Sequence, residues 1–254
     1  MLSYNILDGG AGRAPKLADV IASQRPDIVA LVEADDASVV EQIAGDLNMD
    51  FLHARAGRKG SAILSRWNIR QTIDHAALRD ENLKSLLEAT IVDPSGREWI
   101  VGIVHLAAHA REKDEQKRER QIELVLDIFS EYRKTNRPHL LAGDFNSNSP
   151  IQQIDPQQCK PETRQEWQAN GGGIPRRVVQ KILDADYIDT LAAFDLPQAK
   201  TNGSFSTDFP GQRVDYIFAF GIEAPKIKQA WIEKSPLAKE ASDHFPIGAE
   251  IIDE

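Results

Sequence analysis

Polar side chains interrupt several apolar segments of this sequence, each at or beside the end of an expected buried strand. An unpaired carboxylate placed there costs several kcal/mol unless a cation or hydrogen bonds compensate. Oxygen donors dominate and thiolates are absent, so the set favours a hard cation such as Mg²⁺ over zinc. The members of this set are Asn5, Glu33, His105, Asp144, Asn146, Asp215, Asp243 and His244.

Each of these residues taken alone also fits an ordinary structural role. Asn5 fits a turn cap, and Glu33 fits a position beside a helix N-terminus. Asp144 with Asn146 fits an Asx turn. Only the whole set favours chemistry over structure.

The same holds for the acidic and histidine residues near the C-terminus. Asp215 fits an ion-paired strand residue, Asp243 a hydrogen-bonded anchor and His244 an interior histidine. The remaining four histidines have no comparable context and are assigned no chemistry: His53, His75, His109 and His139.

The sequence pattern predicts alternating strands and helices, and these elements must position the polar set. Such an alternation predicts an α/β fold. The first half contains expected strands at 2–7, 28–32, 62–64, 85–92 and 99–105, with helices from Pro15 and over 37–48. Pro94, Ser95 and Gly96 form the turn that makes 85–92 and 99–105 a hairpin. Antiparallel pairs therefore join the sheet.

The second half begins with a long amphipathic helix over 111–133 and continues with a buried strand at 138–142. The stretch 147–175 lacks periodicity and is expected to be irregular, shaping substrate access. A helix at 176–185, strands at 213–220 and 226–232, and an apolar run after Pro246 complete the chain. Arg176 and Arg177 are expected to be an exposed pair capping their helix, with a phosphate contact as the alternative.

Composition limits the classes of function. The 254 residues are 41% hydrophobic, enough for one large domain or two small ones, and a single domain over 1–254 is expected because no repeat, linker or charge shift divides the sequence. The net charge of −9 excludes a basic nucleic-acid-packaging protein. One cysteine, Cys159, makes no internal disulfide and favours the cytoplasm, with secretion open if a leader is missing. No apolar run is long enough to span a membrane, and a monomer is favoured.

Ordered motifs along nearly the whole chain give the sequence a family resemblance. It resembles the endonuclease/exonuclease/phosphatase superfamily, which includes deoxyribonuclease I, apurinic endonucleases, neutral sphingomyelinases and inositol polyphosphate 5-phosphatases. The motifs are Tyr4-Asn5-Ile6-Leu7, Leu31-Val32-Glu33, Gly60-Ser61-Ala62-Ile63-Leu64-Ser65-Arg66, His105-Leu106, Gly143-Asp144-Phe145-Asn146, Arg213-Val214-Asp215-Tyr216-Ile217-Phe218 and Ser242-Asp243-His244-Phe245-Pro246.

The resemblance implies a four-layer sandwich, in which two packed mixed β-sheets are flanked by helices and the site lies at one edge. It implies that Asn5 and Glu33 hold Mg²⁺, for which Mn²⁺ is a substitute, with Glu33 as the principal ligand. Asp144, Asn146 and Asp243 lie opposite and orient the attacking water or a second ion.

The resemblance also assigns the remaining roles. His105 and His244 contact the scissile phosphate, and Asp215 binds His244. Asp144 is the preferred base, with His244 as the alternative. Arg118 and Gln121 resemble a family motif, and they are expected to brace the sheet edge rather than contact substrate.

The expected function is hydrolysis of a phosphodiester or phosphomonoester in a nucleic acid, a phospholipid headgroup or a small metabolite. A sphingomyelinase-like lipid hydrolase and a catalytically silent binding module are the alternatives. Trp99, Trp167 and Trp231 show no aromatic cluster in the sequence, which disfavours the lipid hydrolase. The complete ligand set disfavours the silent module.

Overall fold

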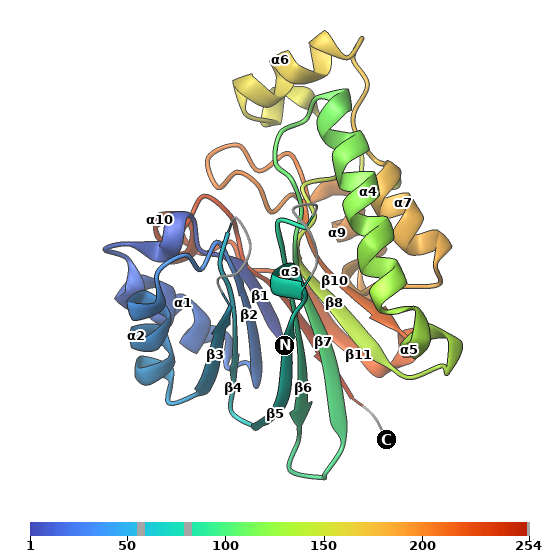
Figure 1. The fold of residues 1–254 in the computed structure, drawn as a ribbon. Coiled ribbons are helices and arrows are strands. Elements are labelled where there is room, and N and C mark those ends of the chain that lie inside the picture. Colours follow the sequence, from blue (N-terminus) through green and yellow to red (C-terminus); the bar gives the residue numbers. More distant parts are fainter. Residues whose placement is uncertain (55–58, 79–82, 253–254) are drawn as a thin grey trace.

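Two six-stranded β-sheets pack face to face in the computed structural model, which describes residues 1–54, 59–78 and 83–252 (Figure 1). The first sheet contains, in spatial order, β11 (Ile227–Ile232), β12 (Ile247–Ile251), β1 (Leu2–Asn5), β2 (Ile28–Val32), β4 (Ser61–Ser65) and β3 (Asp50–Ala54). The second contains β5 (Asn68–Asp74), β6 (Ser85–Val92), β7 (Glu98–His105), β8 (His139–Asp144), β10 (Asp215–Phe220) and β9 (Ile188–Asp189).

Helices cover the outer face of each sheet (Figure 1). The first sheet is covered by α1 (Ala14–Gln24), α2 (Ala37–Leu47) and α10 (Pro236–Ala241). The second is covered by α4 (Glu112–Ile128), α5 (Ser130–Lys134) and α7 (Arg177–Asp184). The remaining short elements are η1 (Asp8–Gly10), α3 (His75–Leu78), η2 (Pro156–Gln158), α6 (Pro161–Ala169), α8 (Thr190–Phe194), α9 (Leu196–Thr201) and η3 (Ala224–Lys226).

The four layers enclose three apolar cores, and β2 shows why its sequence is apolar throughout. Val29 and Leu31 pack toward α1 and α2, whereas Ala30 and Val32 pack between the two sheets. Successive strand residues point to opposite faces, so a strand between two cores needs apolar side chains at every position. The predicted four-layer α/β sandwich is confirmed.

Strand direction brings the polar set to one edge. β1 runs parallel to β2, with Asn5 opposite Val32, and β7 runs parallel to β8, with His105 opposite Asp144. β10 is antiparallel to β8 and begins at this edge, with Asp215 opposite Asp144. The carboxyl ends of four strands and the start of a fifth therefore meet.

Several predicted elements are wrong in detail. The helix expected over 111–133 is divided into α4 and α5 because Phe129, with φ of −86° and ψ of 6°, leaves the helical conformation. The Phe129 ring is buried in the core on the outer face of the second sheet. The stretch 147–175 is not irregular throughout, since η2 and α6 lie within it. α6 lacks an apolar stripe and buries only Thr163 and Trp167, so sequence periodicity gave no signal for it.

Edge strands and short helices were also missed. β3 and β5 lie at sheet edges and alternate weakly between exposed and half-buried residues, which removes the apolar signal of a central strand. β1 ends at Asn5 rather than at residue 7, and β10 starts at Asp215 rather than at 213. None of the helices within the described residues is long and apolar enough to cross a membrane.

Candidate functional site

The Asn5 side chain stands at the centre of the polar edge. Its Nδ2 donates to Glu33 Oε1 at 3.4 Å and to Asp144 Oδ2 at 3.2 Å, and lies 3.4 Å from His244 Nε2. Asn5, Asp144 and His244 are buried, and Glu33 is half-buried. Three residues that lie far apart in the sequence therefore converge on the Asn5 amide nitrogen.

Asn146 fixes the Asp144 carboxylate from the other side. Its backbone N–H donates to Asp144 Oδ1 at 2.9 Å, and its Nδ2 donates to Asp144 Oδ2 at 3.0 Å and to Leu106 O at 3.2 Å. Asn146 has a φ of 50°, a left-handed conformation that asparagine tolerates better than most residues. The turn that Asp144 and Asn146 form therefore also places both side chains at the polar edge.

Gly143 allows β7 and β8 to approach closely at this edge. Its φ is 141°, and a Cβ there would lie 1.9 Å from Val104 O. Any larger residue would push β8 away from β7 and separate Asp144 from His105.

His244 has a carboxylate behind its ring. His244 Nδ1 lies 2.9 Å from Asp215 Oδ2, which also accepts from Ser204 Oγ at 2.7 Å. Burial lowers the pKa of His244, but the charge and hydrogen bond of Asp215 outweigh burial and raise it to about 9. The imidazole is therefore held protonated at neutral pH, with Nε2 directed toward Asp144 at 3.9 Å.

His105 lies in the opposite electrostatic environment. Its Nε2 contacts the Lys84 ammonium, and it lies 3.5 Å from Asp144 Oδ2 and 3.8 Å from Glu33 Oε1. Burial, followed by the charges of Lys84 and His244, holds the pKa of His105 well below its usual range. The imidazole is neutral, so its approaches to the two carboxylates are not ion pairs.

The carboxylates also differ from one another. Burial and the nearby Asp215 raise the pKa of Asp144, against the opposing charge of His244. Burial raises the pKa of Glu33 as well, but hydrogen bonds from the Asp8 backbone and from Lys59 outweigh it and lower the pKa.

Asp243 occupies the rim of this edge. Its Oδ2 lies 3.3 Å from Lys160 Nζ, and its Oδ1 lies 4.0 Å from His244 Nε2. Oδ1 is buried and has no hydrogen-bond partner among the described residues. A buried carboxylate oxygen without a hydrogen-bond partner calls for an explanation, and coordination of a cation would provide one.

The donor set fits a hard divalent cation. Carboxylate oxygens from Glu33, Asp144 and Asp243 face one region, whereas the only thiol in the sequence, Cys159, bonds to Asp155 O. Two groups whose ligand atoms lie within 4.8 Å of one another occur at this edge among the described residues: Asp144, Asp215 and His244, and Asp8, Glu33 and Asp35. Asn5 Oδ1 accepts from Leu7 N, so its amide acts here as a donor to the carboxylates.

Three lysines at this edge were missed by the sequence analysis. Lys59 Nζ contacts Asp8, Glu33 and Asp35, at 2.8, 3.1 and 3.0 Å. Lys84 and Lys160 contact His105 and Asp243. Lysines occur throughout the sequence, mostly on solvated faces, so no sequence signal marked these three.

Arg118 and Gln121 brace the edge as expected. Both are buried on α4; Arg118 donates to Ala107 O and His109 O, and Gln121 Oε1 accepts from Ala107 N. Together they hold the segment that follows His105 in place.

Arg176 and Arg177 do not form the expected exposed pair. Arg176 is half-buried and donates to the backbone oxygens of Ser149 and Gln152. These hydrogen bonds connect the start of α7 to the loop after β8. Arg177 forms ion pairs with Glu112 and Glu119 of α4.

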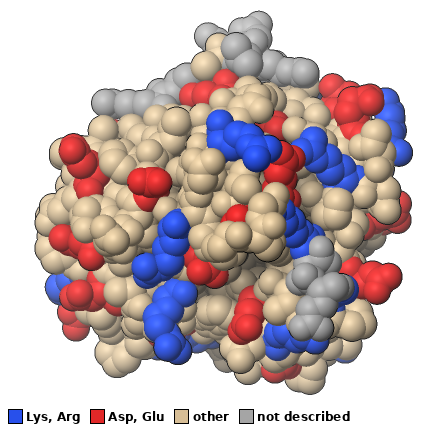
Figure 2. All heavy atoms as spheres, turned by 90° about the horizontal axis from the view of Figure 1, so that it is seen from below, with Lys and Arg blue, Asp and Glu red and all other residues tan. Residues whose placement is uncertain are grey.

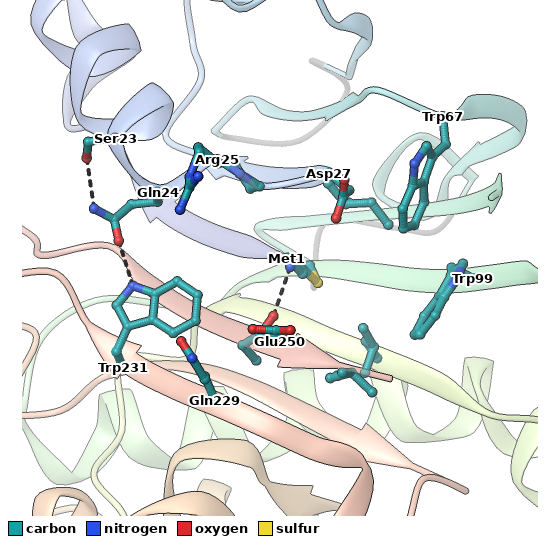
Figure 3. A pocket seen from close by; sticks show the side chains of 15 residues that line it. Met1, Ser23, Gln24, Arg25, Asp27, Trp67, Trp99, Gln229, Trp231 and Glu250 are labelled. Carbon is teal, nitrogen blue, oxygen red and sulfur yellow. Dashed lines mark hydrogen bonds between the residues drawn. The ribbon is translucent and has the colours of Figure 1, made fainter. Parts of the chain in front are cut away.

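A cavity of about 720 Å³ lies at the opposite ends of the same strands (Figure 3). Trp67 and Trp99 stand on one side of it and Trp231 on the other, with Met1 between them. Trp99 and Trp231, distant in the sequence, both line this cavity where the sheets end, but they stand on opposite sides of it. Met1 and Asn5 are the two ends of one strand region, so the cavity is separate from the polar edge.

Surface charge is mixed on the face seen from below. In Figure 2, acidic and basic side chains are interspersed, with no broad area of one sign on this face. This agrees with the absence of a basic field expected from the net charge.

Comparison with known proteins places this site in a family. The family model described as Endonuclease/Exonuclease/phosphatase family matches residues 2–244. A search of curated proteins finds no match.

Solved structures share the fold. An apurinic endonuclease from Archaeoglobus fulgidus has 20% identity and a TM-score of 0.72, with 98% of each chain covered. A 3′-5′ exonuclease from Neisseria meningitidis has 22% identity and a TM-score of 0.71, with 98% of each chain covered. A mannosyl-6-phosphatase from Bacteroides thetaiotaomicron has 19% identity and a TM-score of 0.66, covering 99% of this chain and 98% of that one. With its ordered motifs, its paired sheets and a model match over nearly its full length, this chain belongs to the endonuclease/exonuclease/phosphatase family.

Proposed function

We propose that this chain is a divalent-metal-dependent phosphoesterase that hydrolyses phosphodiester or phosphomonoester bonds by in-line attack of water. One observation carries the proposal: Glu33, Asp144 and His244 surround the Asn5 amide, and Asp215 backs His244. This places carboxylates that can hold a cation beside a protonated imidazole that can donate to a phosphate oxygen.

Glu33, Asp144, Asp243, Asn5 and Asn146 are the residues proposed to hold Mg²⁺, with Mn²⁺ as a substitute. The bound cation would neutralise charge that builds up on a nonbridging phosphate oxygen. The all-oxygen donor set and the unsatisfied Asp243 Oδ1 support this assignment.

Asp144 is the proposed base, and His244 the proposed donor to the phosphate. Asp215 keeps His244 protonated at neutral pH, and a protonated imidazole cannot accept a proton from water. Asn146 holds both Asp144 oxygens, which fixes the direction in which the carboxylate meets the attacking water.

The substrate class remains a phosphate ester in a nucleic acid, a lipid headgroup or a small metabolite. The printed names of the structural relatives include an apurinic endonuclease, an exonuclease and a sugar phosphatase, so the family's fold serves both diesters and monoesters. A monomer in the cytoplasm stays a prediction, as does a single domain over 1–254.

The test is a substrate panel assayed with Mg²⁺, with Mn²⁺ and with EDTA. The panel contains abasic duplex DNA, single-stranded DNA, RNA, sphingomyelin, inositol phosphates and p-nitrophenyl phosphate. We expect turnover of at least one member, abolished by EDTA and lowered roughly 10³-fold by Asp144→Asn. Asp46→Asn makes the same change on the exposed face of α2 and is expected to keep full activity.

Circular dichroism of Asp144→Asn separates loss of chemistry from loss of fold. Absence of turnover for every substrate in Mg²⁺ and Mn²⁺, by a folded wild type, would contradict the proposal and favour the silent binding module. Turnover of sphingomyelin alone would select the lipid-hydrolase alternative.

A further inference from the structure

Lys84 occupies a position beside the site that none of the family motifs includes. It directly precedes β6, whose first residue, Ser85, pairs with His105 of β7. Ser85 Oγ donates to Ser61 Oγ of β4 at 2.9 Å, a buried bond that ties the start of β6 to the other sheet. The backbone that carries Lys84 is therefore anchored at the edge where the polar set converges.

The Lys84 ammonium points into that set. Its Nζ lies 2.5 Å from His105 Nε2 and 3.4 Å from Leu106 O. Burial lowers the pKa of Lys84, an effect that the charges of Asp144 and Glu33 oppose. The half-buried ammonium therefore meets the same His105 nitrogen that lies 3.5 Å from Asp144 Oδ2 and 3.8 Å from Glu33 Oε1.

The contact with Lys84 changes what His105 can do. Because an ammonium can only donate, the 2.5 Å contact from Lys84 Nζ makes His105 Nε2 the acceptor and places the imidazole proton on Nδ1. His105 Nδ1 is buried and has no hydrogen-bond partner among the described residues. Nε2, the atom that faces Asp144 and Glu33, is therefore engaged as an acceptor and has no proton to donate to a phosphate.

From this geometry we infer that Lys84 contacts a nonbridging oxygen of the scissile phosphate and that His105 is the positioning residue that holds its ammonium there. The inference rests on the proposed function, and it deepens it by assigning the cationic donor on the His105 side. The phosphate then meets two donors, the Lys84 ammonium and the His244 ring, whose Nε2 lies 3.9 Å from Asp144 Oδ2. A lysine that only neutralised Glu33 and Asp144 would be the structural alternative.

The first test measures binding of inorganic phosphate, in Mg²⁺, by isothermal titration calorimetry. A lost hydrogen bond between charged groups weakens binding by roughly 10- to 100-fold, so Lys84→Met is expected to lose this much phosphate affinity. Lys84→Arg keeps a cation and is expected to stay within about fivefold of the wild type. Lys113→Met, on the exposed face of α4, serves as the matched control.

The second test is a double-mutant cycle between Lys84 and His105. If His105 acts through Lys84, then His105→Ala combined with Lys84→Met loses no more phosphate affinity than the worse single variant. His105→Gln retains an acceptor for the ammonium and is expected to recover part of the affinity that His105→Ala loses. Additive losses would overturn the positioning role of His105.

The outcomes separate this inference from the proposed function. Unchanged phosphate affinity in Lys84→Met, with a shift only in thermal stability or in Mn²⁺ affinity, would overturn the inference in favour of charge neutralisation. Lost phosphate affinity supports the inference even if the wild type hydrolyses no member of the panel, a result that would overturn only the proposed function.

Discussion

Two buried histidines that both approach Asp144 Oδ2 have opposite protonation. His244 has Asp215 behind its ring and holds its proton, whereas His105 has Lys84 in front of its ring and is neutral. Both are almost fully buried, so desolvation alone would make both neutral. The difference shows that burial sets the neutral state of His105, whereas the Asp215 carboxylate overrides the same burial effect at His244, where solvent screens little.

The largest expected effect comes from deleting the protonated histidine. His244→Ala removes the donor to the phosphate, and we expect kcat to fall roughly 10³-fold, within the range for loss of a positioned proton donor. Steady-state kinetics on the best substrate of the panel measures it. A fall in kcat of less than tenfold in a folded variant would show that His244 is not a catalytic residue, and the search for the donor to the phosphate would turn to the residues around His105.

Removing the carboxylate behind His244 should make the two histidines alike. Asp215→Asn deletes the charge and hydrogen bond that contribute most to raising the pKa of His244, so this pKa should fall, because only the charges of Asp144 and Asp243 then oppose the effect of burial. We expect kcat at neutral pH to drop roughly 10- to 100-fold. Titration of the histidine ring signals by NMR checks the pKa directly, and an unmoved His244 titration would contradict the role given to Asp215.

The comparison also predicts two opposite dependences of stability on pH, measured as the free energy of unfolding in EDTA. The pKa of folded His244 is above that of the unfolded chain, so its stabilisation is complete below pH ~6.5 and is lost as the pH rises through about 9. Relative to His244→Gln, the wild type should lose up to about 3 kcal/mol over this interval. An equal slope in both proteins would contradict the raised pKa.

His105 should act in the opposite pH range. Its folded pKa is lowered, so the unfolded chain binds a proton first as the pH falls below ~6.5, and the folded state is destabilised by acid. His105→Gln should therefore lose less stability than the wild type between pH 6.5 and 5. If both substitutions change the pH dependence of the free energy of unfolding in the same direction, the two histidines do not have opposite protonation states.

The smallest effect is expected at the rim. Lys160 and Asp243 are both partly exposed, at 34% and 29% of their side chains, and such ion pairs contribute little. We expect Lys160→Met to change kcat/KM by about threefold or less, and thermal denaturation to shift by no more than a few degrees. A loss of more than 30-fold in kcat/KM would show that Lys160 contacts substrate. A lysine would then contribute to substrate binding near His244, as Lys84 is proposed to do near His105.

Much of the frame could be predicted because local signals are strong there. The strand 28–32 is apolar at every position, the hairpin strands 85–92 and 99–105 are mostly apolar, and the structure has strands over the same core residues. α6 was missed because it buries only two side chains, and the break at Phe129 was missed because a helical apolar stripe runs through it. Apolar patterns in a sequence indicate which residues are buried and whether their spacing is helical. In α6 the pattern was absent, and at Phe129 it continued through the end of the helix.

The site shows the same division. Asn5, Glu33, Asp144 and His244 could be named from their places at strand ends, and the structure brings them within hydrogen-bond reach of one amide. Lys84 could not be named, because its partner His105 is 21 residues away and meets it only through the pairing of β6 with β7.

By itself, then, the amino-acid sequence determined which donor types are available and which strands are buried, because residue type and apolar period are local properties. Only the tertiary structure decided that Asp215 lies against His244 and Lys84 against His105. Protonation of a buried ring depends on charges within a few ångströms of it, and the fold alone brings those charges there.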